Sequence, residues 1–147
     1  MAITTNAICN SFKKELLEGK HNFAYATPSS VFKLAMYLST AVLGKSTTSF
    51  TTSGQTSSPA GYSSGGKGLV KPNPSTSVAS SVAIVDFNDL SFTNVTLTAR
   101  GALIYNTSNS NSAVAVLDFG GDKTATAGTF TIQFPSFTTS AAIIRIS

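Results

Sequence analysis

Alternation of apolar and polar residues is clearest between residues 94 and 120. Two alternating runs there flank a polar connector at residues 106–112, NTSNSNS. A period of two residues is typical of β-strands, and two such runs joined by a polar segment predict a hairpin. We expect this hairpin to form the centre of a β-sheet domain. The apolar face of its first strand is expected to carry Val95, Leu97, Ala99, Leu103 and Tyr105.

Gly101 interrupts the first strand of this hairpin. A glycine inside a strand often marks a bulge or a close approach of another backbone segment. The neighbouring Arg100 could pair with Asp118 on the second strand, and we favour such a structural ion pair over a contact with a ligand. The hairpin is therefore interpreted as a scaffold and not as a binding site.

Strand-like patterns also occur on both sides of the hairpin. Residues 120–128 are instead typical of a turn region, and Pro135 ends a strand because proline cannot donate to a ladder. With about seven to nine strands, the chain is expected to be mainly β and to form an antiparallel β-sandwich of jelly-roll or immunoglobulin-like type. The further predicted strands lie at residues 21–26, 31–38 (at the edge of the core), 77–87, 90–92, 128–134 and 141–146, with short ones near 49–52 and 68–71.

Only the N-terminal segment has a clear helical period. Ile8, Phe12 and Leu16 recur at every fourth position, which places them on one face of a helix. Gly19 is a typical residue just beyond a helix C-terminus. We predict one amphipathic helix at residues 6–18, and such an apolar face is more often packed on a sheet than held out for a partner. Side chains that could cap its first turn belong to Thr4, Thr5 and Asn6.

Residues 44–74 form a long excursion rich in Ser, Thr, Gly and Pro. Loops of this length without structure of their own are normally functional or disordered. The pieces on either side are too small to fold apart, so residues 1–147 are expected to be a single β-rich domain. If the chain contacts a partner, the helix and this excursion are the better candidates. The candidate interface residues are Ile8, Phe12, Leu16, Phe50 and Tyr62.

The composition favours a hydroxyl-rich surface over a charged one. Charged residues make up 11% of the chain, and 42 of the 147 residues are Ser or Thr; an average globular protein has roughly 25% charged residues. Such compositions are common in β-rich extracellular, adhesive and virion proteins. The net charge of +4 is scattered along the chain, whereas a nucleic-acid groove concentrates its cations on one face. We therefore expect no nucleic-acid partner.

The sequence also argues against a disulfide and a membrane span. There is one cysteine, Cys9, so no disulfide can form within the chain. No apolar run approaches the roughly 18–20 residues that cross a bilayer, and the N-terminus lacks the basic start of a signal peptide. We expect no membrane partner and no export by the signal-peptide route.

Candidate catalytic groups are few. Cys9 and His21 are twelve positions apart with nothing in the sequence to position them, so a thiol nucleophile is not favoured. Asp86 and Asp118 could converge at strand ends, as a hydrolase would need, and with Asp89 and Asp122 they could form a calcium site; no EF-hand spacing supports it. We expect no enzyme, with no catalytic, cofactor-binding or metal-binding residues. The sequence leaves open whether these acidic turns bind calcium.

Several segments together resemble a family of small structural or hypothetical proteins of tailed bacteriophages, with marine phage and cyanophage members. The match covers nearly the full chain. It carries no catalytic motif, so no functional residue is transferred. The segments that carry it are residues 3–23 (ITTNAICNSFKKELLEGKHNF), 32–38 (FKLAMYL), 61–66 (GYSSGG), 99–105 (ARGALIY) and 117–123 (LDFGGDK).

The resemblance implies a virion component that is assembled in the host cytoplasm. A capsid decoration (cement) protein, bound to the outer shell as a homo-oligomer such as a trimer, is favoured; its partners would be copies of itself and the major capsid protein. A tail, baseplate or fibre component, contacting other tail proteins or the host surface, is the alternative. A carbohydrate-binding module is a second alternative, and its candidate stacking residues are Tyr25, Tyr37, Tyr62 and Tyr105.

Overall fold

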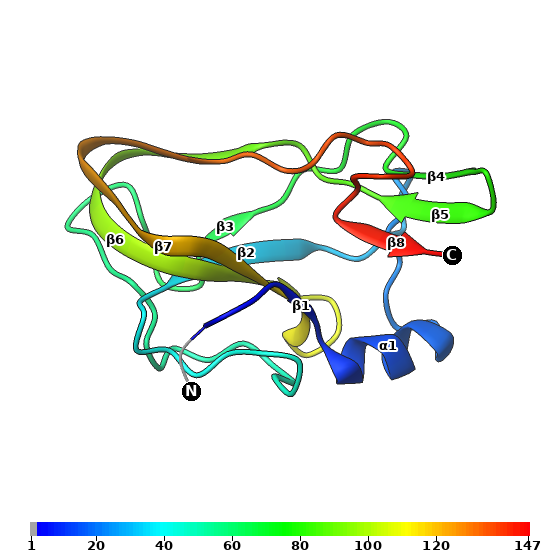
Figure 1. The fold of residues 1–147 in the computed structure, drawn as a ribbon, viewed down its shortest axis with the longest axis horizontal. Coiled ribbons are helices and arrows are strands. Elements are labelled where there is room, and N and C mark those ends of the chain that lie inside the picture. The colour runs from blue at the N-terminus through cyan, green and yellow to red at the C-terminus, as the bar shows by residue number, and fades with distance from the viewer. Residues whose placement is uncertain (1–2) are drawn as a thin grey trace.

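The computed structural model describes residues 3–147, and the fold is mainly β as expected (Figure 1). Two antiparallel sheets are present, one with the strand order β1-β7-β6-β2-β3 and one with the order β4-β5-β8. Together with one short helix near the N-terminus, this arrangement fits a β-sandwich-like fold. The strands are β1 (Ala7–Ile8), β2 (Phe32–Tyr37), β3 (Lys67–Gly68), β4 (Thr76–Ala79), β5 (Val82–Val85), β6 (Leu90–Asn106), β7 (Ser112–Ile132) and β8 (Ile144–Ile146); the helix is α1 (Asn10–Leu17).

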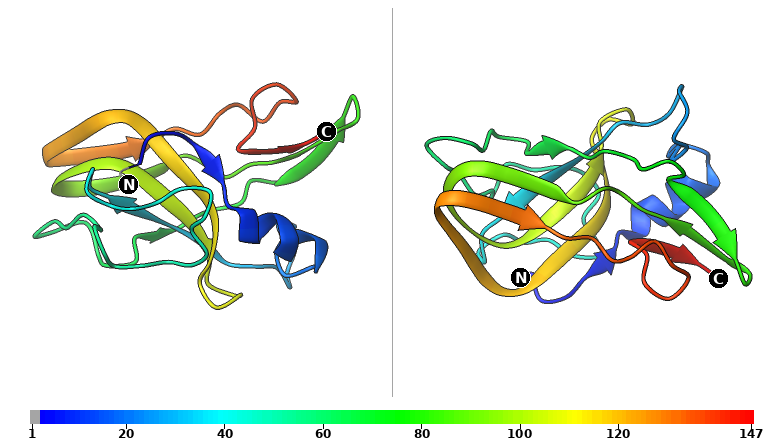
Figure 2. Two further views of the ribbon diagram at one scale, coloured as in Figure 1. Left: turned by 60° about the horizontal axis from the view of Figure 1, so that its bottom comes forward. Right: turned by 90° about the horizontal axis from the view of Figure 1, so that it is seen from above.

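The predicted central hairpin is formed by β6 and β7. The two strands pair from Leu90 opposite Ile132 to Asn106 opposite Ser112, and they form one long ribbon that curls over (Figures 1 and 2). Far from the turn, buried Val95 and Leu97 alternate with exposed Thr96, as the period of two predicts. Near the turn both faces of β6 are buried, because this part of the strand is an interior strand between β7 and β2.

The two strands are longer than the sequence predicts. Residues 90–92 belong to β6, and the expected turn at residues 120–128 lies within β7. Within it Lys123, Thr124, Ala125 and Gly128 pair with β6, and bulges together with the positive φ angles of Gly120 and Ala127 absorb the irregularity. The prediction of a turn at this point was therefore wrong.

Three other strand predictions also need correction. Residues 77–87 are not one strand, because Ser80 and Ser81 adopt positive φ and turn the chain between β4 and β5. Residues 21–26 form no strand; side-chain hydrogen bonds of Asn22 and Ser30 occupy backbone groups there instead. The strand expected at 31–38 is present as β2, but it is an interior strand with mostly buried side chains and not the edge of the core.

Helix α1 is shorter than the predicted range 6–18. The backbone before it is extended, because Ala7 and Ile8 pair with β7 as strand β1 and the Cys9 amide donates to the Val114 carbonyl at 3.0 Å. None of the predicted capping side chains is at the N-cap, which is Cys9. Gly19 ends the helix with a φ of 72°, as predicted. Over residues 3–147, no helix is both long and apolar enough to cross a membrane.

The excursion at residues 44–74 lies along the large sheet. It contributes the short strand β3 and isolated bridges of Ser49 with Ser112 and of Gln55 with Tyr37. Ser49 makes only a bridge where a short strand is expected at 49–52. Phe50 stacks on Tyr105 of β6, with 4.7 Å between the ring centroids. The excursion thus has ordered contacts despite its loop-like composition.

An aromatic cluster joins α1 to the large sheet. Phe12 of α1 packs against His21, with 4.8 Å between the ring centroids. Phe23 stacks on Phe32 of β2 at 4.4 Å, and Phe32 in turn contacts Phe87 at 5.6 Å. Aromatic contacts of this kind add to the burial of apolar area. The cluster fixes the helix and the segment after it against the core.

Gly101 marks a close approach of backbones, as predicted. The pairing of β6 with β7 shifts register between Ala99 and Gly101, and a Cβ atom at Gly101 would lie 2.3 Å from the Leu117 carbonyl oxygen. The predicted ion pair is also present, with Arg100 Nε donating to Asp118 Oδ1 at 2.9 Å. The bulge and the ion pair set the alignment of the hairpin at its middle.

We predict that Gly101→Ala lowers the free energy of unfolding by about 1–3 kcal/mol, because the added methyl group overlaps a backbone carbonyl that cannot swing away. Gly121→Ala is the matched control on the same hairpin, since nothing lies within 4 Å of the added Cβ atom there. Urea unfolding monitored by circular dichroism measures both. Equal stability of the two variants would contradict the close approach.

Candidate functional site

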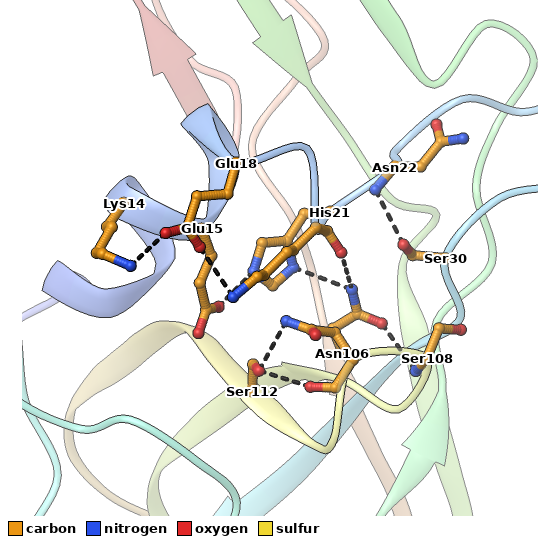
Figure 3. Close-up of polar contacts among 11 residues, drawn as sticks. Lys14, Glu15, Glu18, His21, Asn22, Ser30, Asn106, Ser108 and Ser112 are labelled. Atoms are coloured by element: carbon orange, nitrogen blue, oxygen red, sulfur yellow. Dashed lines mark hydrogen bonds and ion pairs between the residues drawn. The ribbon is translucent and has the colours of Figure 1, made fainter.

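The strongest cluster of polar groups connects α1 to the turn of the β6–β7 hairpin (Figure 3). The His21 side chain is fully buried, and its Nε2 atom lies 2.7 Å from Glu15 Oε2 of α1. Its Nδ1 atom lies 2.9 Å from Asn106 Nδ2, at the end of β6. Nothing in the sequence was expected to position His21. The structure corrects this, because two residues from different elements hold the ring.

The orientation of the Asn106 amide decides which nitrogen of His21 carries a proton. The Ser108 amide donates to Asn106 Oδ1 at 2.9 Å, so the Nδ2 group of Asn106 must face His21 and the Lys20 carbonyl oxygen. An amide NH₂ group can only donate. His21 Nδ1 is therefore the acceptor, and Nε2–H donates to Glu15.

This network has the elements of a catalytic dyad but no access for a substrate. Both ring nitrogens of His21 are engaged, and Phe12, Phe23 and Phe32 surround the ring. A general base needs a free nitrogen within reach of the proton that it removes. The arrangement instead connects α1, the segment after it and the hairpin turn, which is a structural task.

Cys9 is also enclosed. Its side chain is buried beside α1, and its Sγ atom faces the Gly44 carbonyl oxygen at 3.9 Å. Burial, with a smaller contribution from the negative charge of Glu15, raises the pKa of the Cys9 thiol to about 11. A reactive cysteine needs a lowered pKa and exposure. Cys9 is thus a small packed side chain, and the expectation that it is not a nucleophile agrees with its burial.

Asp86, Asp89 and Asp118 each form separate contacts within the fold. The Arg100 side chain, followed by the Gly120 amide, holds the pKa of Asp118 below its ordinary value. Burial raises the pKa of Asp86, whose Oδ1 atom accepts from the Phe87 amide. Asp89 accepts from the Phe134 amide at 2.8 Å. Within residues 3–147, no three His, Cys, Asp or Glu side chains converge as they would around a metal ion.

The predicted interface residues lie mainly inside the molecule. Phe12 and Tyr62 are buried, at 1% and 8% exposure, and the Tyr62 hydroxyl accepts from the Met36 amide at 2.9 Å. Ile8, Leu16 and Phe50 are partly buried and pack against the core. Buried atoms are not available to a partner of the folded chain, so Phe12 and Tyr62 are core residues. The apolar period that suggested Ile8, Phe12 and Leu16 reflects packing.

The four tyrosines expose little aromatic surface. Tyr37, Tyr62 and Tyr105 are buried, and burial raises the pKa of each hydroxyl. Tyr25 is half exposed. Sugar binding by stacking needs exposed aromatic faces close together, and the tyrosines of this chain do not form such a platform.

A groove follows the curled strand β7. Its two adjoining parts have volumes of about 420 Å³ and 410 Å³ and share Phe119, Ile132 and Gln133. Phe119 and Phe130 form part of its apolar floor, with ring centroids 5.8 Å apart. A wider groove of about 700 Å³ lies between the N-terminal segment and residues 42–51, and its lining is rich in Thr and Ser. Asp118 and Lys123 are the charged residues that line the first groove, and Lys45 lines the wider one. Asp118 is already paired with Arg100.

Two of the exposed apolar side chains lie on the small sheet. Val78 of β4 is 71% exposed and Ile146 of β8 is 51% exposed. The strand register places Val78 opposite Ala83 and Ala83 opposite Ile146, so the three form one row across the sheet. This surface was not expected from the sequence, because residues 77–87 were predicted to be one strand and instead contain a hairpin. The signal that could have revealed the hairpin is the pair Ser80–Ser81 between two short apolar runs.

Comparison with protein-family models, curated proteins and solved structures found no match to the chain.

We predict that the neutral ring of His21 carries its proton on Nε2 and that Asn106→Asp lowers the free energy of unfolding by about 1–3 kcal/mol. The substitution replaces a donor by an acceptor facing the His21 nitrogen and the Lys20 carbonyl oxygen, which leaves buried polar atoms unpaired. Histidine ¹⁵N chemical shifts report the tautomer, and urea unfolding reports the stability.

The control for this prediction is Asn88→Asp, which makes the same chemical change at an exposed asparagine. Its effect is expected to stay within about 0.5 kcal/mol. A proton on Nδ1 in the wild-type protein, or equal losses in the two variants, would argue against the network.

We further predict that Cys9 contributes to a loss of stability at alkaline pH. The thiol has a pKa of about 11 in the folded chain, against an ordinary value of 9.0. The folded state therefore binds more protons between these values, and the free energy of unfolding falls as the pH rises from about 9 to about 11. Cys9→Ala should show a shallower decline over this range in urea titrations. The buried tyrosines are common to both proteins, so parallel curves would refute the assignment.

Proposed function

We propose that this chain is a non-enzymatic structural protein of a tailed-phage virion and that it decorates the outer capsid shell. The observation that carries the proposal is that the reactive side chains are buried within the fold. His21 and Cys9 are enclosed within the fold, whereas the exposed surface offers apolar and hydroxyl-bearing groups. A surface of this kind suits docking more than chemistry. The resemblance to small phage proteins supports the same assignment.

The contacts that capsid decoration requires are small. A decoration protein is present in many copies, so each contact with the shell can be small. Exposed apolar side chains on separate parts of the fold, such as Leu17 of α1 and Val42 in the loop after β2, suit contacts of this size. A low density of charge also allows neighbouring copies to lie close together.

A tail, baseplate or fibre component is the second candidate. The wide groove lined by Thr4, Thr5, Ser46 and Thr47 is the feature that favours it, because hydroxyl groups can bond to polar groups of a neighbouring subunit or of the host surface. No observation favours the carbohydrate-binding module over these two placements, since three of the four tyrosines are buried.

We predict that purified phage particles contain this protein at a copy number close to that of the major capsid protein. Quantitative mass spectrometry of intact particles, with isotope-labelled peptides as standards, measures this ratio. Tailless heads isolated from the same lysate should retain the protein, because a decoration protein binds the shell.

The control is a known tail protein of the same phage, which should be absent from tailless heads. A few copies per particle, in a multiple of three or six and lost with the tail, would support the tail placement against decoration. Absence from purified particles would refute a virion role altogether.

A further inference from the structure

Strand β4 is the outer strand of the small sheet. The sheet has the order β4-β5-β8, so β4 pairs with β5 on one side only. The β4–β5 hairpin extends away from the large sheet, and β4 lies on its outer side (Figure 1). Its tight turn at Ser80 and Ser81, both with positive φ, is typical of a two-residue hairpin. The free edge is therefore presented at one end of the molecule.

The outer edge of β4 carries unpaired backbone groups. In an antiparallel pair, alternate residues direct their N–H and C=O groups toward the partner strand. The Asp86 amide donates to the Ser75 carbonyl oxygen at 3.0 Å, so Ser75, Ser77 and Ala79 face β5. Thr76 and Val78 consequently direct their N–H and C=O groups outward, where they can accept another strand.

This edge is short, but it lacks the side chains and irregularities that keep strands apart. Edge strands are commonly protected by charged side chains, prolines or bulges. Residues 72–85, PNPSTSVASSVAIV, contain no charged residue, and Pro74 precedes β4 without lying in it. The pairing of β4 with β5 is also regular along its length. Although the whole chain has a net charge of +4, two copies can meet at this edge without like charges facing each other.

We propose that a second copy of this chain pairs edge to edge with β4. Antiparallel pairing about a two-fold axis at Ser77 places Thr76 of one copy opposite Val78 of the other. Both residues have their backbone groups directed outward, so this register forms four N–H···O=C bonds across the axis. The result is a continuous six-stranded sheet with the order β8-β5-β4-β4-β5-β8.

The same register extends the exposed apolar row. Val78, Ala83 and Ile146 lie on the face that also carries Thr76. A two-fold axis perpendicular to the sheet keeps this face on the same side in both copies. Val78 then packs beside Thr76 of the other copy and lies diagonal to its Val78, and cross-strand neighbours of this kind stabilise sheets.

The size of the edge determines how strong the pairing is. Four residues per copy make a contact at the low end of protein interfaces, well below the roughly 1,600 Å² of a standard stable complex. The dimer is therefore reversible and forms at high concentration, or where copies are held close together. The pairing is a property of the isolated protein and does not depend on the virion placement.

Sedimentation velocity on the wild-type chain over about 10 µM to 1 mM, a range that detects dissociation constants in the micromolar to millimolar region, tests the proposal. We expect a shift from monomer to dimer across this range. Val78→Lys should weaken the association by at least about tenfold, because edge lysines oppose strand pairing. Val42→Lys is the matched control, since Val42 is 70% exposed, lies outside the small sheet and receives the same charge.

A cysteine cross-link tests the register. Ser77 of the two copies would face each other in a non-hydrogen-bonded pair with about 4.5 Å between Cα atoms, a separation that a disulfide can span. Ser77→Cys should form a disulfide-linked dimer on mild oxidation, whereas exposed Ser53→Cys should not; the native Cys9 is buried and does not compete.

Three results would overturn the proposal. They are a monomer at every concentration, equal weakening by the Val78 and Val42 variants, or equal cross-linking at Ser77 and Ser53. None of them bears on the copy number in particles, so a failure here and a failure of the proposed function are separate outcomes.

Discussion

The antiparallel pair β6–β7 forms the centre of the large sheet, and most of the other strands pair with β6 or with β7. Strand β1 adds to the start of β7, and β2 adds to the end of β6. The pairing also brings Arg100 to Asp118 and leaves room only for glycine at position 101. Because these contacts share the same two strands, the register of one hairpin determines where the N-terminal segment, the excursion and α1 can dock.

The polar groups of the chain largely serve this scaffold. His21 joins α1 to the hairpin turn through Glu15 and Asn106, and its ring completes the aromatic cluster beside Phe12. A buried network with its partners in place confers a unique arrangement more than it confers reactivity. The His21 network lies under α1 and holds this helix, which has only eight residues, in a fixed position. The surfaces left for other molecules are consequently grooves and strand edges.

The sequence supported predictions best where the pattern was local. The alternation along 94–120 predicted the hairpin, and Arg100 and Asp118 predicted the ion pair, because the period of two and a single turn relate these positions. Strand β1 was missed because Ala7 and Ile8 also fit a helical period and their partners are distant in the sequence. The His21 network depends on Asn106, which no local pattern connects to it. Ser80 and Ser81 form a turn without the usual Gly or Asn, so the edge strand β4 remained hidden in a longer apolar run.

The pairing of β1 with β7 also has a consequence for the order of events during synthesis. Ala7 and Ile8 pair with residues that are more than one hundred positions later in the chain. The ribosome releases the N-terminal segment first, so Phe12 and its apolar neighbours have no sheet to cover them until β7 has emerged. Contacts between distant positions are slow to form and leave apolar surface exposed meanwhile. The core is therefore complete only after β7 has been made, and α1, which precedes β7 in the chain, is secured only then.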